Sequence, residues 1–213
     1  MNKIISHESE CYKKLHMEHT NGAYWYSKEF VERIIPKIKT DRPFVTINVK
    51  EECMDDAIVV IHNNDHPERY TWLSPYKNLI LLCSKINTLK VVCEMFPQFH
   101  CVYLPMSVDK KYIEKFKVPK KTKKACYFGR LVKCPPEIME DDKIDKLGDM
   151  EREALLKEVA KYRTVYGVGR CAIEARILGA KKVYSDEDYP ILDNLDAVPI
   201  LQRFINEIDG KGK

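Results

Sequence analysis

The segment Tyr166-Gly-Val-Gly-Arg-Cys-Ala-Ile-Glu174 joins a short predicted strand, residues 164–166, to an apolar stretch with helical spacing. Glycines at such a strand-to-helix turn let the backbone approach a ligand, and the free amides of the helix N-terminus attract phosphate. A tight turn that binds nothing uses the same glycines. The segment therefore predicts a strand–turn–helix unit in which Gly167, Gly169 and Arg170 are candidate phosphate contacts.

Outward from this unit, short apolar runs alternate with amphipathic stretches along the chain. The predicted strands are residues 44–49, 57–61, 78–83, 99–104, 125–128, 164–166 and 182–184. The predicted helices are residues 23–35, 87–96, 149–162, 170–178 and 197–208. Runs that are apolar on both faces are typical of buried parallel strands covered by helices. The alternation predicts a doubly wound α/β architecture.

Composition limits the class of protein. The chain has 213 residues, 45% of them apolar and 32% charged, which is enough for one core or two small lobes of about 100 residues. It opens without the apolar core of a signal peptide, and no apolar run is long enough to span a membrane. Its eight cysteines form no CxxC pair, so we expect reduced thiols in a cytoplasmic protein without a metal site.

The positive charge is concentrated between residues 110 and 124, where eight lysines gather. Such a run is either a solvated linker or a patch that contacts nucleic acid or phosphate. We expect an N-terminal lobe over residues 1–110, a basic linker over 111–124 and a C-terminal lobe over 125–213. The last helix is expected to pack back on the N-terminal lobe.

Two cations and one carboxylate are further candidates for the site. Arg130 follows the predicted strand 125–128, at the sheet edge where ligands of open α/β folds bind, and Lys133 lies three residues on. Both suit a diphosphate. Glu174 lies one helical turn after Arg170 in apolar surroundings, so its carboxylate either accepts hydrogen bonds from a ligand such as ribose or pairs with Arg170.

Two further pairs of candidate site residues lie in the first half of the chain. His62 and Asn63 follow the predicted strand 57–61 at its carboxyl end, where a histidine can act as a base or hydrogen-bond an acceptor. Asn21 and Gly22 precede the helix at residue 23 and form either a phosphate or acceptor turn or a plain turn.

Together these motifs resemble a known family. Tyr127-Phe-Gly-Arg-Leu131 and Tyr166-Gly-Val-Gly-Arg-Cys-Ala-Ile-Glu-Ala175 look like the donor lobe of retaining GT-B glycosyltransferases, the family 4-like group. Leu104-Pro-Met-Ser-Val-Asp109 is similar to the motif that joins the two lobes. The resemblance implies two Rossmann-like lobes with parallel sheets. It also implies that Arg130 and Lys133 hold the diphosphate and Glu174 the ribose of a sugar nucleotide, without a metal or other cofactor.

A short phage or prophage subfamily of such proteins is similar in the segments His19–Lys28 and Ile61–Asn64. The resemblance implies transfer of a sugar from a nucleotide-diphosphate sugar to an acceptor, of which a modified DNA base is one example. The basic linker would then contact DNA, and the protein would work in the host cytoplasm, away from membranes.

A second hypothesis is a non-catalytic protein that binds or sequesters a nucleotide. Tyr166 stands where the family has its first glutamate and Ser107 where it has a glycine, and the chain is short. A third is a structural protein that keeps only the fold.

Overall fold

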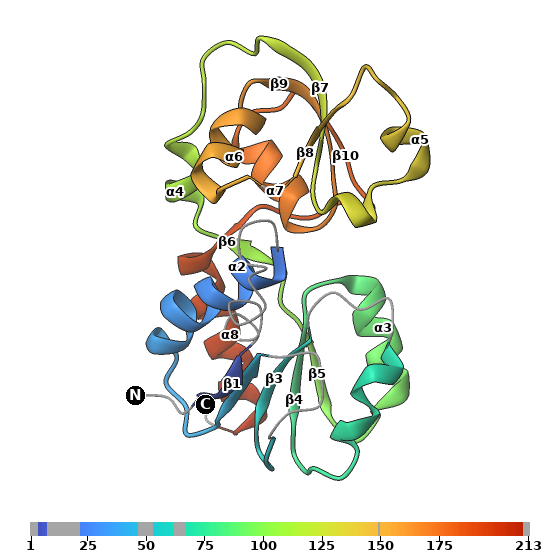
Figure 1. Cartoon of the computed structure of the whole chain (residues 1–213). Helices are drawn as coiled ribbons and strands as arrows, with labels where there is room; N and C mark the ends of the chain where they lie inside the picture. Colours follow the sequence, from blue (N-terminus) through green and yellow to red (C-terminus); the bar gives the residue numbers. More distant parts are fainter. Residues whose placement is uncertain (1–3, 8–21, 47–52, 62–66, 149, 211–213) are drawn as a thin grey trace.

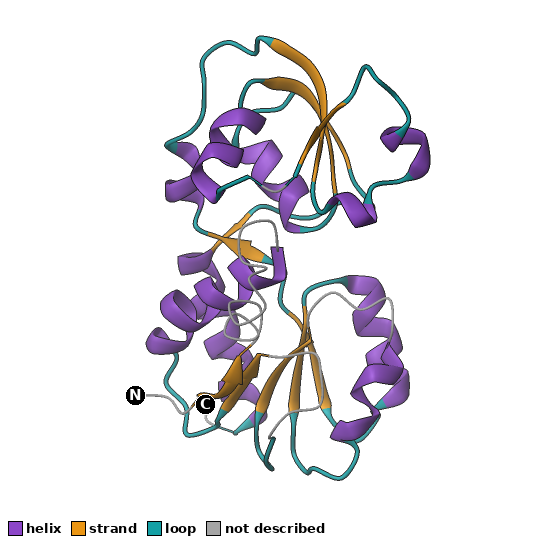
Figure 2. Cartoon of the chain, in the orientation of Figure 1, coloured by secondary structure: helices purple, strands orange, loops and turns teal. Residues whose placement is uncertain are grey.

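The computed structural model describes residues 4–7, 22–46, 53–61, 67–148 and 150–210 (Figure 1). It is a mixed α/β structure with parallel sheets of five, four and two strands. Figure 1 places the two larger sheets at opposite ends of the molecule, and the two-stranded sheet lies between them. Helices accompany both larger sheets (Figure 2).

The first sheet follows the order of the chain. Its strands are β1 (Ile4–His7), β2 (Phe44–Thr46), β3 (Ile58–Ile61), β4 (Ile80–Cys83) and β5 (His100–Tyr103). Every residue of β2, β3 and β4 is buried, as expected for central parallel strands. The connections hold the helices η3 (Pro67–Leu73) and α3 (Ile86–Met95).

The helix predicted over residues 23–35 is a composite of three types of turn. It begins as α2 (Gly22–Glu29), widens into the π-helix η1 (Phe30–Ile34) and tightens into the 3-10 helix η2 (Ile35–Lys37). Proline is accepted in the first turn of η2, because an amide there lacks a helical partner. Tyr26, Phe30 and Ile34, spaced four residues apart, are all buried and form its apolar face.

The second sheet has a different topology. It contains β7 (Lys123–Phe128), β8 (Asp145–Leu147), β9 (Tyr162–Gly167) and β10 (Lys182–Tyr184) in the order β10-β9-β7-β8. From β7 the chain passes through η4 (Leu131–Lys133) and α5 (Pro136–Met139) to β8 on one side. It returns through α6 (Arg152–Val159) to β9 on the other side, and α7 (Arg170–Ile177) leads to β10. The strand order therefore reverses between β7 and β9.

The segments between the two larger sheets cross in both directions. Strand β6 (Ser107–Val108) leads toward the second sheet through α4 (Lys110–Glu114) and pairs with β11 (Leu192–Asp193), which leads back. The expected linker, residues 111–124, thus includes most of α4 and the start of β7. Helix α8 (Asn194–Ile208) returns to the first half, where Gln202 accepts a hydrogen bond of 2.6 Å from the Lys39 amide.

The carboxyl edges of the two larger sheets face each other. Lys85, just after β4, forms an ion pair of 2.7 Å with Asp186, just after β10. Asn87 reaches Glu187 at 3.3 Å in the same region. One buried cluster contains Phe30 of the first half and Phe128 of the second, so this cluster spans both halves, and a second buried cluster lies within the first half. In the described ranges, no helix is long and apolar enough to cross a membrane.

Candidate functional site

The strand reversal in the second sheet brings the two predicted glycine turns together. Gly129 and Arg130 follow β7, whereas Gly167 ends β9 and leads through Gly169 into α7. Phe128 and Gly167 are register partners at the ends of these neighbouring strands. Ligands of open α/β sheets bind outside the carboxyl ends of the strands, where the order reverses. The predicted contacts Arg130, Gly167, Gly169 and Arg170 thus share one edge.

A second helix N-terminus meets this edge from the first half. Gly22 is the first residue of α2, and a Cβ atom built on it would lie 3.6 Å from the Cβ of Arg170, the first residue of α7. Unpaired amides and the helix dipole make each such terminus attractive to anions. Gly22 therefore joins the candidate site, while Asn21, His62 and Asn63 lie outside the described residues.

Two arginines and two glutamates form a buried network beside these termini. Arg170 donates from Nε to Glu174 at 2.6 Å and from Nη2 to Glu29 of α2. Arg152 of α6 donates through both Nη atoms to Glu174, at 2.9 Å from Nη1. The second Glu29 oxygen accepts from the Asp109 amide at 2.8 Å and from Asn194 at 2.7 Å. The network therefore links both halves of the molecule.

Electrostatics keeps the network ionised. Burial of Glu174 opposes its charge, but the Arg152 and Arg170 guanidiniums outweigh burial and hold the pKa of Glu174 below its ordinary value. Burial likewise opposes the charge on Arg170, and Glu29 and Glu174 outweigh it and raise the pKa of Arg170. From the sequence, Glu174 would either bind a ligand such as ribose or pair with Arg170. In the structure it pairs with Arg170 and also with Arg152. A ribose would have to displace one of them.

A small cavity opens beside this network. Gly22, Trp25, Gly129, Arg152, Arg170 and Glu174 are among its lining residues, and its free space is about 10 Å³, roughly enough for one water molecule. Three buried donors of the lining residues have no acceptor among the described residues: Trp25 Nε1, Arg152 Nε and Arg170 Nη1. Buried donors normally have partners. The cavity is therefore suited to an acceptor such as an anion or a water molecule.

Arg130 adds a cation near this cavity. Its guanidinium opposes the rise in the pKa of Cys171, which burial and then the Glu174 charge lift to about 12. Cys171 lines the cavity, so the Arg130 charge acts at its margin. Neither Arg130 nor Lys133 is itself among the cavity-lining residues, but Gly129, directly before Arg130, is, whereas Lys133 lies in η4 with an exposed side chain. Of the two predicted diphosphate contacts, Arg130 is the better placed.

The Gly169 turn already holds an internal anion. The Gly169 amide donates a long hydrogen bond of 3.4 Å to Asp186, whose other oxygen accepts from Lys85 and from Tyr189 at 2.7 Å. Burial opposes ionisation of Asp186, and these two hydrogen bonds outweigh it, so the pKa of Asp186 is lowered. A ligand phosphate at this turn would have to compete with Asp186 for the Gly169 amide.

Gly169 is required by backbone geometry. Its φ of 58° and ψ of −124° lie in a region that side chains avoid. We expect Gly169→Ala to lower the free energy of unfolding by about 1–3 kcal/mol, measured by urea denaturation. Gly22→Ala is the matched control at the same site, since its Cβ would meet only an ordinary contact of 3.6 Å. Equal losses in the two variants would contradict the assignment of strain to Gly169.

Sequence reasoning missed two site residues, Glu29 and Arg152, and for Trp25 it favoured helix packing over stacking on a base or sugar. Trp25 belongs to an aromatic run that indicates helix packing, yet its ring lies 5.1 Å from the Arg152 guanidinium. Arg152 begins an ordinary charged amphipathic helix, and no local pattern separates it from its exposed neighbours. For Glu29, the available signal is a carboxylate directly before the buried Phe30.

Comparisons with protein-family models, with curated proteins and with solved structures give no significant match. What the fold and the site define is an α/β protein with a small cavity at a strand reversal, lined by two arginines and the glutamate that they share. Within the described part of the chain, no group of three or more histidine, cysteine or acidic side chains is arranged to hold a metal ion.

Proposed function

We propose that this chain is a reduced GT-B-like glycosyltransferase that binds the diphosphate of a sugar nucleotide between the carboxyl ends of β7 and β9. The observation that carries the proposal is the set of three buried donors, on Trp25, Arg152 and Arg170, around one cavity. That cavity lies where the strand order reverses and where two helix N-termini meet. Each of these features favours a phosphate ligand.

The opposed carboxyl edges support a two-sided site. The donor would occupy the second-sheet edge, and His62 and Asn63, which directly follow β3, would serve the acceptor at the edge of the first sheet. In the transfer, the bond between the anomeric carbon and the diphosphate oxygen breaks, and the diphosphate leaves with the electron pair. The acceptor hydroxyl bonds to the anomeric carbon and gives its proton to the His62 imidazole.

The arginines would supply the charge stabilisation for the leaving group. Arg130 at the margin and the unpaired donors of Arg152 and Arg170 would neutralise the diphosphate as it leaves. Glu174 is best assigned to orienting Arg152 and Arg170, because both of its oxygens are already bound to them. Lys133 would contact only the outer part of the diphosphate, since its exposed side chain lies in η4, three residues beyond Arg130.

The cavity is small, so binding requires the crevice to widen. The Lys85–Asp186 ion pair closes the edge between the two sheets, and only about 34% of the Asp186 side chain is exposed. A nucleotide that displaced Asp186 from the Gly169 amide would release this pair as well. Binding and separation of the two carboxyl edges are therefore coupled in this proposal.

Binding without turnover is the second candidate. The Tyr166 ring stacks on the Tyr184 ring, with centroids 4.8 Å apart and planes at 13°. An aromatic pair thus occupies the position at which the resembled family has its first glutamate. A protein that kept the diphosphate site and lost that carboxylate would sequester a nucleotide.

A thermal-shift panel of nucleoside diphosphates and their sugar derivatives tests binding. A ligand at 100 times its Kd should stabilise the fold by about 2.7 kcal/mol, which raises the Tm by several degrees. Arg130→Ala should abolish most of the shift, and Arg203→Ala, an exposed arginine on α8, should keep it. No shift with any compound would contradict both candidates.

Turnover separates the two candidates. Release of the nucleoside diphosphate from a sugar donor, followed by chromatography, is expected for the transferase. His62→Ala should remove turnover and keep the thermal shift. A protein that shows the shift and never consumes a donor would be a nucleotide-binding protein, and the transferase proposal would be wrong.

A further inference from the structure

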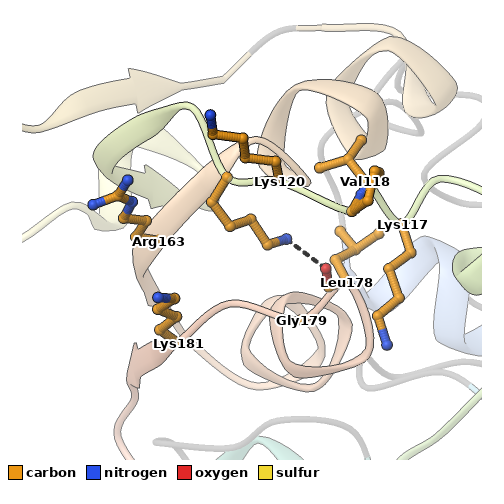
Figure 3. Close-up of a pocket in the computed structure, with 9 residues that line it drawn as sticks. Lys117, Val118, Lys120, Arg163, Leu178, Gly179 and Lys181 are labelled. Atoms are coloured by element: carbon orange, nitrogen blue, oxygen red, sulfur yellow. Dashed lines mark hydrogen bonds between the residues drawn. The ribbon is translucent and has the colours of Figure 1, made fainter.

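The second sheet carries another charged surface at its amino edge, opposite the proposed crevice. A groove of about 590 Å³ lies there, lined by Lys117, Lys120, Lys121, Arg163 and Lys181 together with aliphatic residues such as Leu178. Figure 3 shows Lys117, Lys120, Arg163 and Lys181 arranged around it. No acidic side chain is among the described residues that line this amino-edge groove.

Strand register aligns three cations into a row beside the groove. Lys123 and Ala125 of β7 face Tyr162 and Thr164 of β9, so Lys124 lies opposite Arg163. Lys181, one residue before β10, lies opposite Arg163 on the other side, where its amide donates to the Arg163 carbonyl at 2.8 Å. Neighbouring strands are about 4.8 Å apart, and like charges placed directly opposite are destabilising. A bound polyanion would offset this repulsion.

Two lysines next to the groove are neutralised by a carboxylate, unlike the cations that line it. Lys123 and Lys161 both bind Glu158, each at 2.6 Å. Within the described residues, no ion pair joins an acidic side chain to Lys117, Lys120, Arg163 or Lys181. The positive charge of the groove is therefore available to an anionic ligand.

Lys121 has a structural part in the groove. Its ammonium donates to the carbonyls of Ala160 at 2.6 Å and Leu178 at 2.5 Å, close to the C-terminal ends of α6 and α7. Burial and the nearby Lys117 charge lower the pKa of Lys121. Lys121 thus fixes the groove floor and is left unchanged in the test below.

We propose that the amino-edge groove binds the phosphate backbone of duplex DNA without regard to sequence. The row of cations crosses three strands and continues into the groove, which suits a chain of phosphates better than a single one. The described residues that line the groove include no aromatic side chain on which unpaired bases could stack, which favours a duplex over a single strand. Because the groove is on the opposite edge, this inference stands independently of the proposed transferase activity.

Fluorescence anisotropy with a labelled duplex of arbitrary sequence, titrated at several salt concentrations, tests the proposal. The test variant is Lys120→Gln, Arg163→Gln and Lys181→Gln combined, and all three residues are exposed. We expect at least a tenfold loss of affinity at low salt and a salt slope reduced by about 3, one for each phosphate contact. The control combines Lys37→Gln, Lys90→Gln and Arg203→Gln, which removes the same charge from exposed positions elsewhere.

Equal losses in the test and control variants would overturn the proposal, because they would show a response to net charge alone. Tighter binding of single-stranded DNA, or of single-stranded RNA, than of duplex DNA would overturn the proposal too. Inorganic tripolyphosphate is the probe for a small-anion site. If it displaced the duplex one to one, and affinity did not rise with duplex length, the groove would be a small-anion site. Circular dichroism of each variant verifies the fold.

Discussion

Glu174→Ala is expected to cost about 3–5 kcal/mol of stability, the usual loss when one partner of a buried ion pair is removed. The substitution leaves two buried guanidiniums, Arg152 and Arg170, which are 5% and 3% exposed, without the carboxylate that they share. Glu29 can still pair with Arg170, but Arg152 would keep no carboxylate among the described residues. Urea denaturation followed by circular dichroism measures the loss.

The matched control for this prediction is Glu207→Ala on α8. Glu207 pairs with Arg203 at 3.7 Å on the helix surface, where both side chains are more than half exposed. Such exposed pairs contribute about 0–0.5 kcal/mol. Glu174→Gln should fall between the two, since it keeps the shape and an acceptor and loses the charge. If Glu174→Ala cost no more than Glu207→Ala, the network would not hold the halves together.

Arg42→Ala is expected to lower the free energy of unfolding by about 2–4 kcal/mol, because a buried guanidinium with several charge-assisted hydrogen bonds is lost. Arg42 is 8% exposed. Its Nη1 donates to the carbonyls of Asp56 at 3.0 Å and Asn78 at 2.8 Å, and its Nε donates to Asp209 at 2.9 Å. Asp56 and Asn78 both have positive φ, and each lies in the turn before a strand. Arg42 thus fixes two strained turns and the end of α8.

The distinguishing measurement for Arg42 is a comparison with Arg33→Ala by thermal denaturation. Arg33 is also an arginine of the first half, but it is half exposed and pairs only with Asp109 in the described structure. We expect a change in Tm at least three times larger for Arg42→Ala, in proportion to the hydrogen bonds lost. Similar changes in both variants would show that the Arg42 contacts contribute little.

Local pattern was sufficient to predict the elements that surround the candidate site. The turn at Gly167–Gly169, helix α7 from Arg170 and strand β10 lie where the sequence indicates, because glycine spacing and apolar runs determine them. The mixed α/β class with parallel strands is confirmed as well. Strand β8 was missed, since Asp145-Lys-Leu147 is a polar edge strand without an apolar run.

The local sequence pattern could not predict the long-range contacts of the candidate site. Arg152, Glu29 and Glu174 come from α6, α2 and α7, and only the strand order of the second sheet and the return of α8 bring them together. The sequence left the partner of Glu174 open because an i,i+4 arginine is visible in one helix, whereas Arg152 is 22 residues away. The row formed by Lys124, Arg163 and Lys181 likewise depends on register.

Tryptophan fluorescence tests the central claim, a nucleoside diphosphate site at the strand reversal, most directly. The chain has two tryptophans, and Trp72→Phe leaves Trp25, which lines the cavity, as the single reporter. Titration with the nucleoside diphosphate that gives the largest thermal shift should change its emission saturably. Adding Arg130→Ala should raise the Kd by about 10–150-fold, the equivalent of one charged hydrogen bond. An emission unchanged at millimolar ligand, in a folded protein, would contradict the claim.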